Sequence, residues 1–313
     1  MKQLPTARWV VGILLLVMNL GISIPGEANQ KDTWVSDLTE YIPDRSIDAL
    51  TGSQFVNLVS ALDEEQRERM IEQQLLQGNL PDFLRKLKPI KLQKRNSEGR
   101  IVEVTLFVTP DYLAIGSQQD FIRIPMDYHS ASMVAARFRF ILPTRRMVDA
   151  IYVQSENRFT PQPLPPGPQM RTTGYYQLHN SKITRQRLTR GIILGELMSG
   201  HKKDVVISNK LINKPERVAI YGWHRSEGNP IQPLSTVHGA GYADYSHGVR
   251  LVSEKILVNG KQRFIYDVLS DPQLSSLLSD EGPLTTFYKH SKRTVLFADL
   301  DRSGTIYYRA GSP

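Results

Sequence analysis

The apolar residues of positions 33–87 recur every three to four residues, which is the period of an amphipathic helix. Asp63 followed by Gln66 matches a capping box, so a helix is expected to begin there. Gly78 is a typical residue to end that helix, and Pro81 is a typical residue to begin a further short one. The pattern therefore predicts a chain that starts with helices.

A period of two replaces this pattern at residues 101–108, where apolar and polar residues alternate. Such alternation is typical of a strand with one face on a core, and residues 89–95 are expected to pair with it. The other elements predicted before residue 160 are an edge strand at 121–125 and helices at 133–138 and 145–153. Residues 29–160 are thus predicted to form an α+β amino-terminal domain.

A proline-rich segment follows, because residues 161–168 hold five of the chain's nineteen prolines. Such a run is extended and offers few backbone donors. We expect a linker over residues 161–170, with a domain on each side. A single domain with a proline-rich crossover is the alternative.

The remaining part, residues 171–313, is predicted to be rich in strands. Asn259-Gly260 between two short apolar runs is a strong signal for a hairpin turn. The elements expected here are helices at 175–190 and 272–278, strands at 205–208 and 217–223, and hairpins formed by 255–258 with 262–266 and by 294–300 with 305–309. The predicted fold class is α+β, a helical/β amino-terminal unit followed by a strand-rich carboxy-terminal unit.

Residues 1–28 have the pattern of a cleavable secretory signal peptide. Lys2 and Arg8 precede a short apolar run, and small residues lead up to Ala28. The apolar run is shorter than the roughly 20 residues needed to cross a bilayer, so we expect no transmembrane segment once the signal is cleaved. The protein is therefore predicted to be secreted or periplasmic.

Composition narrows the chemistry of the mature chain, residues 29–313. The sequence has no cysteine, which excludes disulfides, thiol nucleophiles and thiolate metal ligands. Cleavage removes two positive charges, Lys2 and Arg8, and one negative charge, Glu27, so the formal net charge falls from +8 to +7. No basic run is interleaved with aromatic residues, so we expect no specific nucleic-acid partner. An exported basic protein has cell-wall polymers or peptides as candidate partners.

Candidate chemistry is concentrated in residues 233–252. Five of the seven histidines fall between His179 and His247, and His238, Asp244 and His247 lie close together in the sequence. Imidazole and carboxylate groups near neutrality can exchange protons or bind a metal. We therefore predict these three residues as catalytic groups, with zinc as a possible cofactor that all three would ligate.

Part of this segment resembles a known signature. His238-Gly239 and the run Ser-His-Gly-Val-Arg-Leu at residues 246–251 are similar to the His-Gly and Ser-His-Gly-Cys-(Ile/Val)-Arg-(Leu/Met) motifs of the L,D-transpeptidase catalytic domain. The resemblance is confined to residues 238–251, and it implies a strand-rich fold in which His247 is the base and Arg250 shapes the oxyanion region. The family's nucleophilic cysteine is absent, since Gly248 is followed directly by Val249.

Other residues near the predicted strand ends extend the candidate site. His201 and Asp204 could form an acid–base pair, and Lys202 and Arg250 could hold a substrate carboxylate. Further substrate-binding candidates are Trp223 and His224, as a stacking wall with a titrating edge, and the two hydroxyls of Ser235 and Ser246. A serine nucleophile would need one of these hydroxyls beside an imidazole, although Ser246 and His247 are neighbours that point apart on a strand.

Two functions follow from these observations. The first is a cell-envelope hydrolase that acts on peptidoglycan peptides or wall polysaccharide through its His/Asp cluster. The second is a non-catalytic wall-binding or scaffold protein with a degenerate transpeptidase-like groove.

Overall fold

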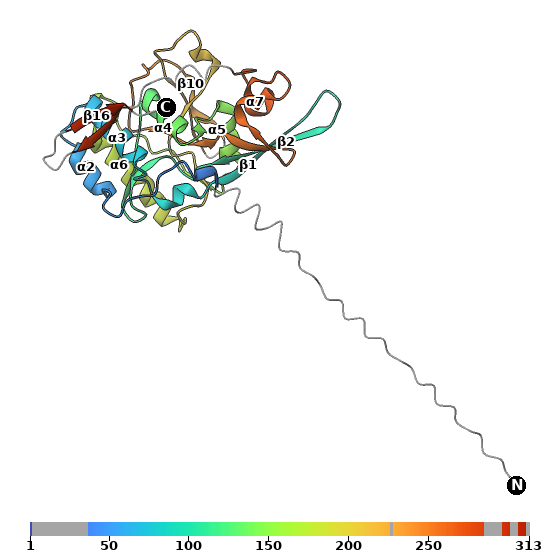
Figure 1. Ribbon diagram of the computed structural model, residues 1–313, viewed down its shortest axis with the longest axis horizontal. Coiled ribbons are helices and arrows are strands. Elements are labelled where there is room, and N and C mark those ends of the chain that lie inside the picture. The colour runs from blue at the N-terminus through green and yellow to red at the C-terminus, as the bar shows by residue number, and fades with distance from the viewer. Residues whose placement is uncertain (2–36, 226–227, 285–295, 301–305, 311–313) are drawn as a thin grey trace.

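The computed structural model describes Met1 and residues 37–225, 228–284, 296–300 and 306–310 (Figure 1). The predicted signal peptide lies outside these residues, apart from Met1. Within the described part of the chain, no helix has the length and hydropathy that a bilayer crossing requires. Helices and mixed sheets are both present, which confirms the α+β class.

The early helices follow their sequence signals. Thr51 caps the first of them with its side chain, and Asp63 and Gln66 form the predicted capping box of the second. Gly78 follows the second helix with a φ of 78°, which a glycine adopts without steric cost. The elements of this part are the 3-10 turn η1 (Asp37–Thr39), α2 (Gly52–Val59), α3 (Glu64–Leu76) and η2 (Asp82–Arg85).

The largest sheet of the described residues has six strands, in the order β14-β13-β2-β12-β5, with β1 paired to β2. The predicted pairing of the first two strands is confirmed, since Lys88 aligns with Val108 and Arg95 with Ile101. The strands are β1 (Lys88–Arg95), β2 (Ile101–Val108), β5 (Phe140–Ile141), β12 (Val252–Ser253), β13 (Lys255–Val258) and β14 (Lys261–Phe264). In the described part of the chain, the predicted edge strand, β4 (Phe121–Arg123), does not join this sheet and pairs with β3 (Ala114–Gly116) instead.

This sheet joins the two sides of the proline-rich segment. β2 precedes that segment in the sequence, and it pairs with both β12 and β13, which follow it. One apolar cluster likewise runs from Leu38 to Leu284. Leu164, within the proline-rich segment, is buried in this cluster and donates its backbone N–H to the Tyr245 hydroxyl at 2.8 Å. Of the two arrangements that the sequence left open, this shared sheet and core favour a single unit with a proline-rich crossover.

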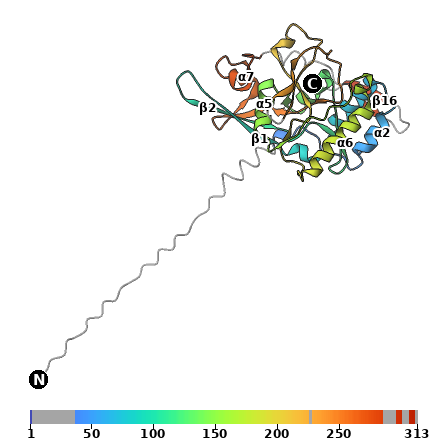
Figure 2. The same ribbon diagram turned by 180° about the vertical axis from the view of Figure 1, so that it is seen from behind.

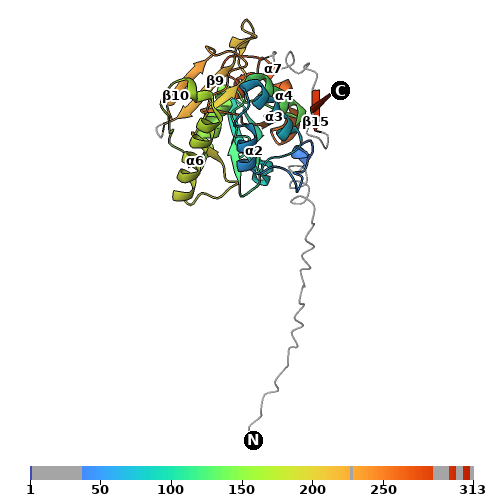
Figure 3. The same cartoon turned by 90° about the vertical axis from the view of Figure 1, so that its left-hand side faces the viewer.

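Helices cover the end of the molecule away from the β1–β2 hairpin. In Figure 1, α2, α3 and α6 (Thr173–Thr189) lie together on the left, and the hairpin projects on the right; Figure 2 shows the same arrangement from behind. Figure 3 looks onto this helical side, where α4 (Tyr128–Arg137) also lies. Further elements are α5 (Arg145–Gln154), β6 (Asn157–Arg158), η3 (Pro168–Arg171), β7 (Met198–Ser199) and η4 (Asn209–Leu211).

The end of the chain agrees with its turn signals in part. Asn259 and Gly260 both have positive φ, as the predicted tight hairpin turn requires. Residues 262–266 are not a complete strand, because β14 ends at Phe264 and α7 (Ile265–Ser270) begins there. The last elements are α8 (Ser275–Leu278) and the hairpin of β15 (Leu296–Leu300) with β16 (Ile306–Ala310), which was predicted.

Candidate functional site

A four-stranded sheet brings the candidate residues together. Its order is β10-β9-β8-β11, with β8 (Lys203–Val206), β9 (Ala219–His224), β10 (Pro230–Ser235) and β11 (His247–Gly248). β11 runs parallel to β8, so that His247 aligns with Lys203 and Gly248 with Asp204. The Ser-His-Gly run and the Gly200–Asp204 turn are therefore neighbours in space, although β9 and β10 separate them in the sequence.

The predicted trio of His238, Asp244 and His247 forms a cluster with Tyr242 at its centre. The His238 ring stacks on the Tyr242 ring, with centroids 4.1 Å apart and planes 8° apart. The Tyr242 hydroxyl donates to Asp244 Oδ2 at 3.1 Å, and His247 Nε2 is 4.0 Å from the same oxygen. The rings of His238 and His247 are 6.3 Å apart. We call these four residues and Lys203 the histidine cluster.

Burial within the histidine cluster increases inwards. His247 is fully buried, and neither of its ring nitrogens has a hydrogen-bond partner in the described part of the chain. Burial lowers the pKa of His247 below its ordinary value, against the opposing effect of Asp244, so the imidazole is neutral at pH 7. His238 and Tyr242, whose rings lie 6.3 Å and 5.7 Å from that of His247, are half-buried.

Asp244 carries the negative charge of the cluster. Burial alone would raise its pKa, but His247, the bonds from Ser246 and the Lys203 ammonium together lower it. The Lys203 ammonium lies 5.3 Å from the Trp223 ring, at a cation–π distance. Burial lowers the pKa values of His238 and Lys203 as well, so at neutral pH the cluster combines a carboxylate with neutral imidazoles beside the half-buried Lys203 side chain.

Neither serine is placed as a nucleophile. Ser246 donates its hydroxyl to Asp244 Oδ1 at 2.5 Å and its backbone N–H to the same oxygen at 2.8 Å. This bonding holds Ser246 against the carboxylate rather than against an imidazole. The Ser235 hydroxyl accepts from the backbone N–H of Val237. The serine-nucleophile mechanism is therefore not supported by the geometry.

Lys202 and Arg250 do not reach a groove, which corrects their prediction as substrate-binding groups. Lys202 is 1% exposed and donates its ammonium to the Tyr245 carbonyl at 2.7 Å. Arg250 is also 1% exposed and donates to the carbonyls of Thr109 at 2.6 Å and Met198 at 2.7 Å. Both side chains brace buried backbone.

The predicted acid–base pair of His201 and Asp204 is not formed. His201 Nε2 lies 2.8 Å from Asp111 Oδ1, and Asp204 Oδ2 accepts from the Tyr112 hydroxyl at 2.8 Å. Both side chains are buried. They point to different partners because His201 lies in the turn before β8, whereas Asp204 lies within that strand. Burial raises the pKa of Asp204 to about 6, although Arg250 opposes this effect.

Trp223 and His224 are both buried, so they do not form the predicted wall of an open groove. Trp223 has a φ of 57°, an uncommon conformation for a tryptophan. His224 stacks on Tyr152 at 4.5 Å, and its Nε2 lies 3.0 Å from Asp149 Oδ1. These contacts place His224 with α5 rather than with the histidine cluster.

The predicted zinc ligands do not converge. Among the described residues, no group of three or more His, Asp or Glu side chains is arranged to hold a metal ion. The reason lies in the cluster itself, because the Tyr242 ring packs against His238 and also contacts His247, at 5.7 Å. The prediction of His238, Asp244 and His247 as one ligand set was wrong.

A cavity of about 310 Å³ adjoins the histidine cluster through the loop that carries Tyr242. Gly241 and Ala243 line it on one side, and Glu68 and Glu72 of α3 on the other. Burial and the nearby Asp127 raise the pKa of Glu68. The Arg171 guanidinium, which also lines the cavity, lies 5.0 Å from the Tyr242 ring. Sequence reasoning missed these residues, since α3 is distant from the cluster along the chain.

Comparison with known proteins adds no relative, since no family model, curated protein or solved structure matches this chain.

Proposed function

We propose that the protein is an exported cell-envelope hydrolase in which the histidine cluster activates water for attack on peptidoglycan peptides or wall polysaccharide. The observation that carries the proposal is His247, a buried imidazole with both nitrogens unpartnered among the described residues and a carboxylate 4.0 Å away. Buried polar atoms are nearly always hydrogen-bonded, and an exception calls for a bound water or a catalytic role.

The proposed roles follow from charge and position. A water bound to one of the unpartnered ring nitrogens of His247 would lie within reach of this imidazole. His247, neutral at pH 7, would take the proton from that water as its oxygen attacks the substrate, and would later return it to the leaving group. Asp244 would stabilise the imidazolium formed in between, and Lys203 the developing oxyanion.

Digestion of purified sacculi tests this proposal. The wild-type protein should release soluble fragments, and His247→Gln should reduce the rate about 100-fold or more, the usual contribution of a general base. His129→Gln is the matched control, because His129 lies on α4 and contacts Tyr128 rather than the cluster. Unchanged release by His247→Gln would exclude the catalytic role.

Export is part of the proposal and has its own test. The support is the sequence pattern of residues 1–28 alone. Amino-terminal sequencing of the protein recovered from the cell envelope or the medium should begin at Asn29. A chain that retains Met1 and stays with the cytoplasmic fraction would contradict export.

A wall-binding protein without catalysis is the second candidate. It is favoured by the bonding of Ser246 to Asp244 and by the missing cysteine, which together leave the transpeptidase-like segment without a nucleophile. Cosedimentation with sacculi separates the two functions. Retention on sacculi without fragment release supports binding alone, and release that depends on His247 supports the hydrolase.

A further inference from the structure

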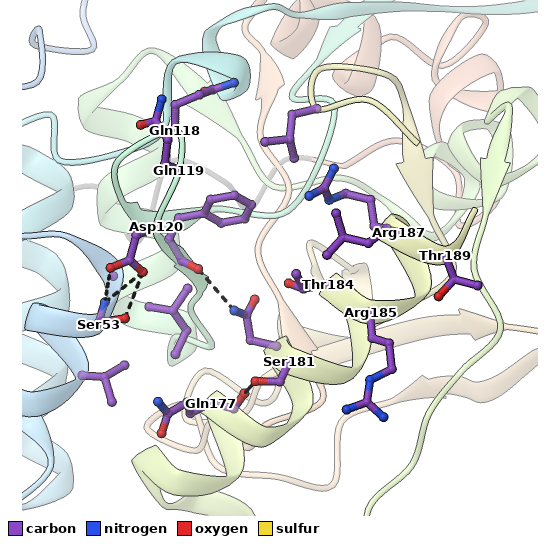
Figure 4. A pocket seen from close by; sticks show the side chains of 17 residues that line it. Ser53, Gln118, Gln119, Asp120, Gln177, Ser181, Thr184, Arg185, Arg187 and Thr189 are labelled. Atoms are coloured by element: carbon purple, nitrogen blue, oxygen red, sulfur yellow. Dashed lines mark hydrogen bonds between the residues drawn. The ribbon is translucent and has the colours of Figure 1, made fainter. Parts of the chain in front are cut away.

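A second cavity, of about 490 Å³, lies on the helical side, and none of its lining residues belongs to the histidine cluster. Its walls are the start of α2, the loop that leads into β4, and one face of α6 (Figure 4). The first two walls are in close contact: a Cβ on Gly52 would come within 2.6 Å of Phe121 Cα. We call the space between these two walls and α6 the α6 cleft.

Uncharged hydrogen-bonding side chains dominate the polar lining of the α6 cleft. Those on α6 are Gln177, Asn180, Ser181, Thr184 and Thr189, and Gln118 and Gln119 line the cleft from the loop (Figure 4). The Ser181 hydroxyl donates to the Gln177 carbonyl, and the side-chain oxygen of Gln118 accepts from the Phe83 backbone N–H. Amides and hydroxyls both donate and accept hydrogen bonds, so such a lining suits a ligand with many groups of the same two kinds.

The one carboxylate that lines the α6 cleft within the described chain is already bound. Asp120 accepts from the Ser53 backbone N–H at 3.1 Å and 3.2 Å and from the Ser53 hydroxyl at 3.1 Å. The Asn180 amide is also used, since its oxygen accepts from Arg123 and its nitrogen donates to the Phe121 carbonyl. The polar floor of the cleft is therefore fixed by the protein itself.

Two guanidinium groups remain as the charged groups of the α6 cleft. Arg185 is exposed. Arg187 donates through Nη1 to the Ile192 carbonyl at 2.9 Å, but its Nε is buried and has no partner among the described residues. Burial and the nearby Arg123 both lower the pKa of Arg187. An anion in the cleft would supply the missing acceptor and offset this positive potential.

Apolar surface completes the lining. Leu188 is 62% exposed at the cleft, and the half-buried Phe121 and Leu194 lie along it. A large exposed leucine beside hydrogen-bonding groups is typical of a surface that contacts a ligand with both apolar and polar faces.

We propose that the α6 cleft binds an acidic oligosaccharide, that is, a chain of N-acylated sugars that carries carboxylates. Sugar hydroxyls and acyl amides match the glutamine, serine and threonine side chains, and the apolar face of a pyranose ring matches Leu188 and Phe121. A carboxylate pairs with Arg185 or Arg187. The volume of about 490 Å³ falls in the usual range for small-ligand sites. This binding goes beyond the proposed hydrolysis and does not depend on it.

Calorimetry with the purified mature chain tests the proposal, with three probes: a hyaluronan tetrasaccharide, which has N-acetyl groups and carboxylates; chitotetraose, which lacks the carboxylates; and inorganic phosphate. The tetrasaccharide should bind saturably, and chitotetraose at least tenfold more weakly. Arg185→Gln should weaken binding of the tetrasaccharide at least fivefold, and so should Gln177→Leu, which keeps the size of an exposed side chain but removes its amide.

Lys182→Gln is the matched control, because it removes a charge from the same helix at a position that does not line the cleft. Lys182→Gln should bind like the wild type. No saturable binding of the tetrasaccharide, equal binding of inorganic phosphate, or unchanged binding by Arg185→Gln would each overturn the proposal. Repeating the titration with His247→Gln separates the two sites, since binding should persist there whether or not the protein is a hydrolase.

Discussion

The Asp111 carboxylate and the Arg123 guanidinium form an ion pair, 2.7 Å between Oδ2 and Nη2, in which neither side chain reaches solvent. Arg123 Nε also donates to the same oxygen at 2.8 Å, and His201 Nε2 lies 2.8 Å from the other one. Burial alone would raise the pKa of Asp111, but Arg123 and His201 hold it well below its usual range. The position of the His201 ring follows from this pair, because its partner is the Asp111 carboxylate rather than a substrate.

Breaking the Asp111–Arg123 pair should strongly destabilise the protein. Asp111→Asn would leave the Arg123 charge buried without a counter-ion, which costs about 3–5 kcal/mol. Urea denaturation followed by circular dichroism measures the loss. Glu65→Gln is the control, since the pair of Glu65 with Arg69 is exposed and should contribute less than about 1 kcal/mol. Equal small losses in the two variants would contradict a stabilising role for the buried pair.

Local sequence signals predicted most of the helices and strands, but they could not predict the contacts between distant segments. The capping box at Asp63 and the turn at Asn259 act through neighbouring residues, so the sequence shows them directly. The pairing of β2 with β12 and β13 depends on register between strands on opposite sides of the proline-rich segment, which no local pattern encodes. For that reason the sequence predicted a domain boundary at residues 161–170, although strands from both sides of this segment belong to one sheet.

In the candidate site, too, the local clustering could be predicted from the sequence, whereas the contacts between distant segments could not. His238, Asp244 and His247 are close in the sequence, and their clustering was predicted. Between the adjacent lysines, however, the sequence favoured Lys202, whereas the pairing of β8 with β11 places Lys203 beside His247. Neighbours on a strand point to opposite faces, so choosing between them requires the register.

Gly248 allows the close contact between β11 and Tyr112. A Cβ at this position would lie 2.6 Å from Tyr112 Cδ1 and 2.8 Å from Cγ, too close for any side chain. Gly248→Ala should therefore displace the ring, loosen its bond to Asp204, and cost about 1–3 kcal/mol. Thermal unfolding measures the cost. Gly174→Ala is the control and should cost little, because its Cβ would come no closer than 4.0 Å to another residue's atom and its φ lies outside the strained positive range.

The Gly248→Ala result has a second readout. Double substitution with Tyr112→Leu should recover part of the lost stability if the ring is the obstacle, since it removes the clashing atoms. A Gly248→Ala protein as stable as the wild type would contradict the close contact.

Lys202 should make the folding stability rise with pH in the alkaline range. Burial, and then the nearby Arg123, lower its pKa to about 7, whereas in the unfolded chain it stays near about 10.4. Between these values the unfolded chain binds one more proton, so stability rises with pH by about 1.4 kcal/mol per unit. Lys202→Met should lack this rise, so the stability difference between the two proteins should change by several kcal/mol from pH 7 to pH 10. Parallel curves for the two would contradict a depressed pKa.

His247 should make the folding stability depend on pH in the acid range, and here too stability should rise with pH. Burial lowers its pKa in the folded protein, so between the unfolded value of about 6.5 and the lower folded value the unfolded chain again binds the extra proton. Stability is therefore lost as pH falls below about 6.5. His247→Gln should reduce that loss by at least about 1 kcal/mol, and His129→Gln should not. Denaturation curves from pH 7 to pH 4 measure both. If the His247→Gln curve runs parallel to the wild-type curve, the pKa of His247 is the same in the folded and unfolded chains, and the lowering of that pKa by burial is excluded.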